Sequence, residues 1–310
     1  MPKNIALETK NIVKYYKGGY QAVKGIDLTV YEGDFFALLG PNGAGKSTLL
    51  GMVSSLVRIS SGDSYLFGNS ITQYPREAKK LLGFMPQEVN LSIFETPLQI
   101  LLTHAGYHGI SRNRTLNQVN YLLRVMELYD ERNYQVRFLS GGMKRRLMVA
   151  RALVHKPKVL ILDEPTAGVD VELRTAMWNK IKSLNDEGLT IILTTHYLEE
   201  AERLCNRLAL INKGELYINT TMSDMFNNSS NETYIVDLKE SYFNMDFLES
   251  LSTFKFSKVS DRSVCVDISG SESLNQLFNL FLSHSIEVVS IRKDFTKLER
   301  IFMKIASSNK

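Results

Sequence analysis

The chain has 310 residues, of which 44% are hydrophobic and 23% are charged, which is the composition of an ordinary globular protein and excludes a disordered chain. Its 37 Lys+Arg and 33 Asp+Glu leave a net charge of +4 that is scattered along the chain, so charge alone does not predict nucleic-acid binding. No apolar run approaches the roughly 18 residues of a membrane-spanning helix. Cys205 and Cys265 lack neighbours at metal-ligand spacing, so we expect free thiols in a cytosolic protein.

A buried strand followed by a glycine-rich loop is the first strong signal. Ile26 to Val30 alternates like a half-buried strand, whereas Phe35 to Leu39 is a continuous apolar run, as in strands covered on both faces. The next residues fit the phosphate-loop pattern G-x-x-x-x-G-K-[ST], in which glycines let backbone N–H groups converge on phosphate oxygens. Lys46 supplies a positive charge for the β- and γ-phosphates, and Ser47 is placed to ligate Mg²⁺. The helix that begins at Lys46 points its positive end at these phosphates. The residues predicted to hold the nucleotide phosphates are Gly40, Pro41, Asn42, Gly43, Ala44, Gly45, Lys46, Ser47 and Thr48.

Such a loop occurs in kinases, GTPases, ATPases and helicases, so later motifs must choose among them. After a helical stretch from Leu116 to Met126 come Leu139, Ser140, Gly141, Gly142 and Met143. Ser140 is a good N-cap, and the glycines leave the N–H groups of the following helix unobstructed, which indicates a second anion-binding helix terminus. We expect this helix to carry Lys144, Arg145 and Arg146 and to continue to about His155 before Pro157. The alternative is a capped helix with a basic, solvated face.

Two adjacent carboxylates end the next buried strand. Val159 to Leu162 is apolar and runs into Asp163 and Glu164, at the edge where open α/β sheets bind ligands. Asp163 is predicted to hold Mg²⁺ and Glu164 to accept a proton from the attacking water. A helix at Val171 to Leu184 and a strand at Leu189 to Leu193 follow, so strands and helices alternate as in an α/β sheet covered by helices.

The sequence changes character near residue 220, and the polar cluster Asn227 to Asn231 predicts a domain boundary. The order expected beyond it is β-α-β-β-α-β plus a terminal helix, which predicts a small ferredoxin-like α+β domain. The expected strands are Thr233 to Leu238, Phe254 to Val259, Ser263 to Ile268 and Glu287 to Ile291, and the expected helices are Met245 to Leu251, Glu272 to Ser283 and Lys297 to Ile305.

These pieces in this order resemble the ATP-binding subunits of ABC transporters, over about residues 5 to 220. The motifs that carry the resemblance are the phosphate loop, Gln87 after Phe84-Met85-Pro86, the signature Leu139 to Met143, Asp163-Glu164, the loop ending in Asp170, and His196 after an apolar strand. Two positions depart from the frequent pattern: Met143 stands where many members have Gln, and Ala167-Gly168-Val169-Asp170 replaces Ser-Ala-Leu-Asp. Both variants, and the closing segment Thr296 to Ile305, resemble drug-exporter ATPases of the two-component type.

The resemblance implies an α/β phosphate-loop ABC ATPase domain over 1–226, with a helical subdomain at about 88–155. The accessory domain predicted from the residues beyond the boundary then spans 232–310. It implies that Tyr16 stacks on adenine, with Tyr15 and Tyr20 as alternatives. It implies that Gln87 is a metal-binding and catalytic residue and that His196 orients the attacking water and the γ-phosphate. The resemblance also implies that Asp170 belongs to the nucleotide-binding residues.

The resemblance also implies partners. Two copies are expected to pair head to tail, so that Ser140, Gly141 and Gly142 of one copy close over the γ-phosphate held by the other, and ATP and Mg²⁺ are the expected cofactors. A separate membrane permease is expected to hold the pair at the cytoplasmic face of the membrane, docking near Gln87, with no nucleic acid involved. Two alternatives are a soluble ABC ATPase acting on nucleic acid or ribosomes, and a non-catalytic ATP sensor. The first usually has two cassettes or a long coiled coil, and the second lacks the base that Glu164 supplies here.

Overall fold

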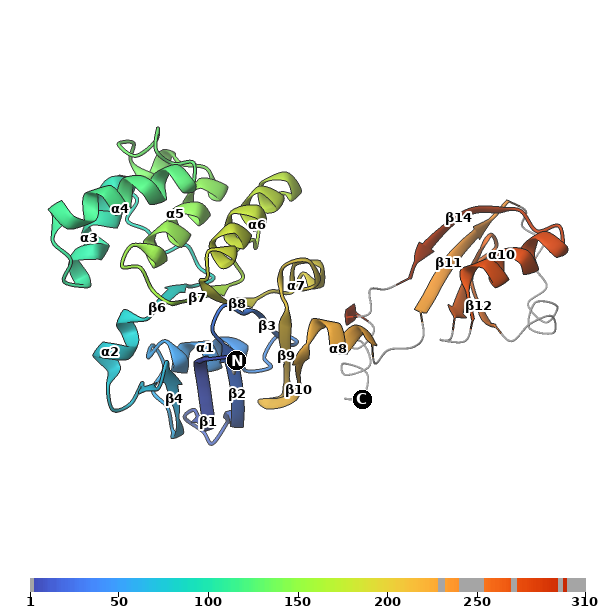
Figure 1. Cartoon of the computed structure of the whole chain (residues 1–310), viewed down its shortest axis with the longest axis horizontal. Coiled ribbons are helices and arrows are strands. Elements are labelled where there is room, and N and C mark those ends of the chain that lie inside the picture. The colour runs from blue at the N-terminus through green and yellow to red at the C-terminus, as the bar shows by residue number, and fades with distance from the viewer. Residues whose placement is uncertain (1–2, 228–231, 240–253, 269–271, 295–297, 300–310) are drawn as a thin grey trace. The chain divides into compact units, whose positions relative to one another are not determined.

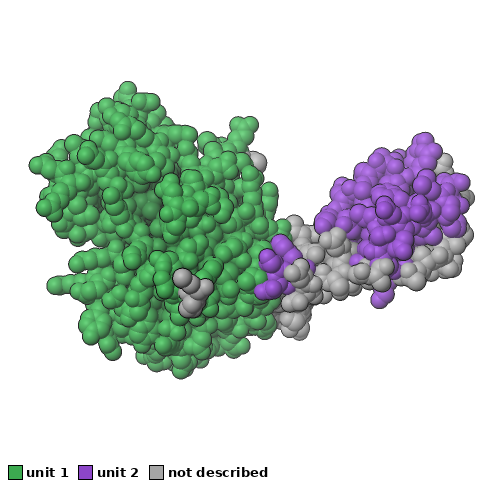
Figure 2. Space-filling model, in the orientation of Figure 1, with its two compact units in different colours: residues 1–222 green, residues 223–310 purple. Residues whose placement is uncertain are grey.

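The computed structural model describes residues 3–227, 232–239, 254–268, 272–294 and 298–299. The chain divides into two compact units, Met1–Met222 and Ser223–Lys310, coloured separately in Figure 2. The helix expected at Met245 to Leu251 and nearly all of the closing helix expected at Lys297 to Ile305 lie outside the described residues.

A six-stranded sheet forms the centre of the first unit, in the order β10-β9-β3-β8-β7-β6. Neighbours from β9 to β6 run parallel, and β10 is antiparallel to β9. Its strands are β3 (Phe35–Leu39), β6 (Leu82–Met85), β7 (Val159–Asp163), β8 (Thr190–Thr194), β9 (Arg207–Asn212) and β10 (Glu215–Thr221). Every residue of β3, β7 and β8 is buried, because parallel strands are covered on both faces. The buried strands predicted at Phe35 to Leu39, Val159 to Leu162 and Leu189 to Leu193 are confirmed.

A second, antiparallel sheet has the order β2-β1-β4-β5. It consists of β1 (Ile5–Tyr15), β2 (Gln21–Tyr31), β4 (Ser61–Leu66) and β5 (Asn69–Ser70). The hairpin between β1 and β2 turns at Gly18 and Gly19, both at positive φ, so Tyr16 lies where the hairpin turns. The alternating strand predicted at Ile26 to Val30 is the end of β2, whose buried residues form one core cluster with those of β3 and α1 (Lys46–Val53).

Three helices pack against one another beyond the β6–β7 edge of the central sheet, as Figure 1 shows. They are α3 (Pro97–Tyr107), α4 (Arg112–Val125) and α5 (Gly141–Leu153), with the short 3-10 turn η1 (Val136–Phe138) before α5. A capping box of Thr96 and Gln99 fixes the start of α3. The helix α5 ends at Leu153, two residues before the predicted end at His155. The remaining helices of this unit are α2 (Pro75–Lys80), α6 (Val171–Asp186) and α7 (Leu198–Leu204), and α8 (Met222–Asn227) begins at its last residue.

The second unit contains a four-stranded antiparallel sheet in the order β12-β13-β11-β14. Its elements are β11 (Glu232–Leu238), β12 (Lys255–Ser260), β13 (Ser263–Ile268), α10 (Leu274–Ser283) and β14 (Val288–Lys293). Val236 and Val266 of the sheet pack with Leu277 and Phe281 of α10 in a separate core. The first strand lies between the third and the fourth, which is the strand order of a ferredoxin-like β-α-β-β-α-β domain. The α/β fold with a smaller α+β unit is thus confirmed.

In the described part of the chain, no helix combines the length and the apolar character that crossing a bilayer requires.

Candidate active site

The glycine-rich loop connects β3 to α1 and turns sharply. Gly40, Gly43 and Gly45 have φ angles of 153°, 78° and 104°. A Cβ on Gly40 would lie 2.2 Å from the Ile211 carbonyl oxygen, and one on Gly45 would lie 2.6 Å from that of Ala22, so both positions require glycine. The helix α1 begins after Gly45 with no side chain bonded to its first turn. Its first N–H groups are therefore available to an anion inside the loop.

Lys46 is buried beneath this loop, with 9% of its surface exposed. Its Nζ donates hydrogen bonds to the carbonyl oxygens of Gly40, at 2.7 Å, and Pro41, at 3.0 Å. Burial lowers the pKa of Lys46, and the carboxylates of Glu164 and Asp163 oppose that shift. The ammonium group is thus fixed where phosphate oxygens would neutralise it.

Asp163 ends β7 and lies beside the phosphate loop. Its carboxylate accepts hydrogen bonds from the Thr194 Oγ1 and from Ser47. Burial raises the pKa of Asp163, and those hydrogen bonds and the charge of Lys46 oppose the shift. A carboxylate and a hydroxyl held together beside a phosphate loop form an oxygen donor set that fits Mg²⁺.

Glu164 has an unusual backbone conformation, with φ at 48°. Its N–H lies 3.1 Å from both the carbonyl oxygen and the Oγ1 of Thr194, so the neighbouring strand β8 holds it there. Its Oε2 accepts a hydrogen bond from the Gln87 Nε2 at 2.8 Å and lies 3.4 Å from the His196 Nδ1. The structure therefore brings Gln87, Glu164 and His196 together, although they are far apart in the sequence.

A pocket of about 480 Å³ opens above the loop and contains several of the predicted residues. Tyr16 and Tyr20 both line the pocket, whereas Tyr15 does not. Of the two alternatives to Tyr16 as the residue that stacks on adenine, Tyr20 is therefore the one that lies at the pocket. The Tyr16 hydroxyl lies 3.4 Å from the Thr48 Oγ1, which places its ring at the mouth of the loop. The full lining is Tyr16, Tyr20, Ala22, Asn42, Gly43, Ala44, Gly45, Lys46, Ser47, Thr48, Gln87 and Glu164.

The signature residues lie apart from that lining. Ser140 caps α5, its Oγ accepting the Met143 N–H at 3.2 Å, and Gly141 is exposed. A Cβ on Gly142 would lie 3.1 Å from the Leu173 Cδ1, which is a tight contact with an exposed side chain. Asp170 caps α6 through the Leu173 N–H, at 3.0 Å. Ser140, Gly141, Gly142 and Asp170 are absent from the pocket lining, so among the described residues the starts of α1 and α5 do not line the same pocket.

Arg145 and Arg146 of α5 make contacts inside the protein and so do not belong to the solvated basic face considered as an alternative. Arg146 donates to the Met126 carbonyl oxygen at 3.0 Å and to Glu127 at 2.8 Å, and it is largely buried. Arg145 donates to the carbonyl oxygens of Gln87 and Ala167, in the loops before α3 and α6. Sequence reasoning missed this role of Arg145, because nothing in a run of basic residues shows which of them turns inward.

Thr194 is a second residue that the sequence analysis missed. It donates to Asp163 and receives the Glu164 N–H, so it positions both carboxylate residues. The available signal was its place at the carboxyl end of a buried strand, two residues before His196.

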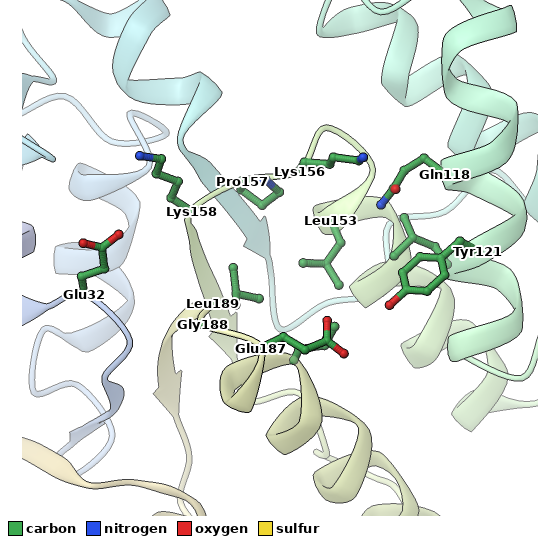
Figure 3. Close-up of a pocket in the computed structure, with 12 residues that line it drawn as sticks. Glu32, Gln118, Tyr121, Leu153, Lys156, Pro157, Lys158, Glu187, Gly188 and Leu189 are labelled. Atoms are coloured by element: carbon green, nitrogen blue, oxygen red, sulfur yellow. The ribbon is translucent and has the colours of Figure 1, made fainter.

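A second pocket, of about 320 Å³, lies at the opposite, amino-terminal ends of β7 and β8 (Figure 3). Gln118 and Tyr121 reach it from α4, and Glu187 from the end of α6. Lys156 and Lys158 are exposed there. None of the predicted site residues lines this pocket.

Comparison with known proteins adds independent findings. Residues 23–167 match the family model described as ABC transporter. The chain is 34% identical to the linearmycin resistance ATP-binding protein LnrL of Bacillus subtilis (strain 168) over 305 residues, covering 96% of this chain and 97% of that protein. It is 44% identical to the Nod factor export ATP-binding protein I of Cupriavidus metallidurans over 208 residues, or 67% and 68% of the two chains. A dimeric post-hydrolysis ATP-binding cassette bound to ADP and Pi superposes with a TM-score of 0.63 at 27% identity, covering 70% of this chain and 98% of the other.

Proposed function

The chain belongs to the ABC transporter ATP-binding family and is an ATP-hydrolysing subunit, and from that premise we propose that it drives a separate membrane permease that exports a substrate. The observation that carries the proposal is the arrangement around Glu164: a carboxylate fixed between Gln87 and His196, at the mouth of a loop that binds phosphate. The names of its relatives, which include a resistance protein and an export protein, support the direction of transport.

In this proposal the loop Gly40 to Thr48 binds the triphosphate through its N–H groups, and Lys46 exchanges its two loop carbonyls for the β- and γ-phosphate oxygens. Ser47 and Asp163, with Gln87, would hold Mg²⁺, and the metal would neutralise phosphate charge. Tyr16 stacks on the adenine. The binding step therefore places the γ-phosphate facing Glu164.

Hydrolysis then requires a positioned water molecule and a base. Glu164 accepts the proton of the attacking water, and its φ of 48° directs the carboxylate out of the strand toward the pocket. His196, 3.4 Å from Glu164, orients that water and the γ-phosphate. Gln87 donates a hydrogen bond to the Glu164 Oε2 at 2.8 Å and so helps to hold the base in position beside the loop.

The charge on the γ-phosphate needs a clamp from its far side, which one copy of the chain lacks. We propose that Ser140, Gly141 and Gly142 of a second copy supply it, with Asp170 at the same contact. The exposed start of α5 and its absence from the chain's own pocket support this head-to-tail pairing, as does the dimeric relative bound to ADP and Pi. ATP then holds two copies together, and its hydrolysis separates them.

The permease supplies the membrane part in this account and holds the subunit at the cytoplasmic face through the segment that begins at Gln87. The domain limits that go with the proposal are an ATPase domain over 1–226, with its helical subdomain at about 88–155, and an accessory domain over 232–310. No observation favours the alternative in which the ATPase acts on nucleic acid or ribosomes.

The test is extraction of the chain from its own cells in mild detergent, followed by identification of the chains that accompany it and by an ATPase assay. We expect a multi-spanning membrane chain whose presence raises the ATPase activity. A nucleic acid or ribosomal partner in its place would support the alternative and contradict the transport role.

A further inference from the structure

Arg145 lies at the centre of three parts of the site that are far apart in the sequence. It belongs to the first turns of α5, directly after the signature residues. Its Nη1 donates to the Gln87 carbonyl oxygen, and its Nη2 donates to the Ala167 carbonyl oxygen at 3.3 Å. The two ends of one guanidinium group thus join the loop after β6 to the loop that precedes α6.

The surroundings of Arg145 show that these contacts are not incidental surface bonds. Arg145 is half-buried, and burial lowers its pKa, while the negative charge of Glu164 opposes that shift. A half-buried charge retains its position only when its hydrogen bonds are made. The neighbouring basic residue Lys144 makes no hydrogen bond or ion pair with its side chain among the described residues.

We infer that Arg145 is a positioning residue for ATP hydrolysis. It fixes the backbone of Gln87 relative to that of Ala167, so that the Gln87 side chain contacts Glu164. The inference rests on the proposed function, because it requires Glu164 to be the base. The Gln87 amide reaches the Glu164 Oε2 at 2.8 Å in the conformation that Arg145 holds. The planar, forked guanidinium can bind two carbonyl oxygens at once, which a lysine ammonium at the end of a flexible stem does less well.

The experiment is steady-state hydrolysis of MgATP by the purified full-length chain and its variants. Arg145→Ala is expected to lower kcat about tenfold while KM for ATP changes less than about twofold, because ATP contacts the loop and not Arg145. Arg145→Lys retains the charge near Glu164 but not the fork, and its kcat is expected to stay at least about threefold below that of the wild type. Lys144→Ala, one position away in the same turn, is the matched control and is expected to hydrolyse ATP like the wild type.

A double variant separates positioning from general damage to the fold. Because Arg145 acts through Gln87, the double variant is compared with Gln87→Ala alone. We expect adding Arg145→Ala to lower kcat by less than about twofold relative to Gln87→Ala. Four outcomes would each overturn the inference. In Arg145→Ala, they are a wild-type kcat, a KM that rises as much as kcat falls, and a loss of kcat that a lower melting temperature explains. In the double variant, the outcome is a loss of kcat equal to the sum of the two single losses. A wild-type chain without ATPase activity would instead refute the proposed function, and the inference with it.

Discussion

The two edges of the central sheet hold pockets made of similar residue types, yet they differ in how those residues are held. The carboxyl edge has Lys46 and Glu164, and the amino edge has Lys158 and Glu187. Lys46 is buried with two carbonyl partners, and Glu164 is fixed by two side chains and by its own N–H. Lys158 and Glu187 are exposed. A lysine and a glutamate in a pocket therefore do not make a catalytic site unless burial and directed hydrogen bonds fix their positions.

The largest expected effect comes from the carboxylate at the catalytic edge. Glu164→Gln removes the proposed base while keeping the hydrogen-bonding shape, so we expect kcat for ATP hydrolysis to fall about 10³-fold with ATP binding retained. Steady-state ATPase assays and a nucleotide-binding titration measure the two quantities. The matched change at the other edge, Glu187→Gln, is expected to leave both unchanged, and equal losses from the two substitutions would remove the distinction between the edges.

The buried lysine provides the second comparison. Lys46→Ala removes the charge that faces the β- and γ-phosphates, and ATP affinity is expected to fall roughly 100-fold, or about 2.7 kcal/mol. Lys158→Ala at the amino edge serves as the control, with affinity expected within about twofold of the wild type. Isothermal titration with MgATP distinguishes them. An affinity unchanged by Lys46→Ala would mean that the loop does not hold the phosphates.

Thr194 tests whether the catalytic edge depends on the strand beside it. Thr194→Val keeps the shape but removes the hydrogen bonds to Asp163 and to the Glu164 N–H. We expect the free energy of unfolding to fall by about 1–2 kcal/mol and kcat to fall about tenfold. Chemical denaturation and ATPase rates at saturating ATP check both. A variant with lower stability but wild-type kcat would show that Thr194 supports the fold and not the chemistry.

The smallest expected effect concerns histidines of the helical part. Burial lowers the pKa of His155 to about 4, and the charge of His108 lowers it further. Burial also lowers the pKa of His104 to about 4, and the charge of Arg151 contributes to that shift. The unfolded chain binds these protons near pH 6.5, so stability is complete above that pH and falls as the pH drops toward 4. After allowance for partial exposure we expect about 1 kcal/mol from this source. His155→Gln should make the melting temperature less dependent on pH in this range, and an unchanged dependence would exclude His155.

Most of the catalytic edge could be predicted because its residues are tied to recognisable spacings. The glycines at 40, 43 and 45 are dictated by positive φ angles and close backbone contacts, and the strand before them is buried on both faces. Strands β3, β7 and β8 lie within one residue of their predicted limits for the same reason, since a continuous apolar run between turns has few alternatives.

Other features depend on the folded chain and left no local pattern. Three contacts join segments that are far apart in the sequence. They are the hydrogen bonds of Arg145 to Gln87 and Ala167, that of Gln87 to Glu164, and those of Thr194 to Asp163 and Glu164. The expected end of α5 at about His155 rests on Pro157 as the residue that stops the helix, and the helix ends two residues earlier, at Leu153. The roles of Ser140 and Asp170 at the nucleotide stay predictions, since in one copy these side chains cap helices.

We propose that the site above the phosphate loop is half of an ATP site and that a second copy of the chain completes it. The mass of the Glu164→Gln chain by light scattering, with and without MgATP, tests this directly. We expect the mass to double from 35.2 kDa when MgATP is added, and to stay at 35.2 kDa when Ser140→Arg is added to that chain, although ATP still binds. A Glu164→Gln chain that is saturated with ATP and remains a monomer would contradict the proposed pairing.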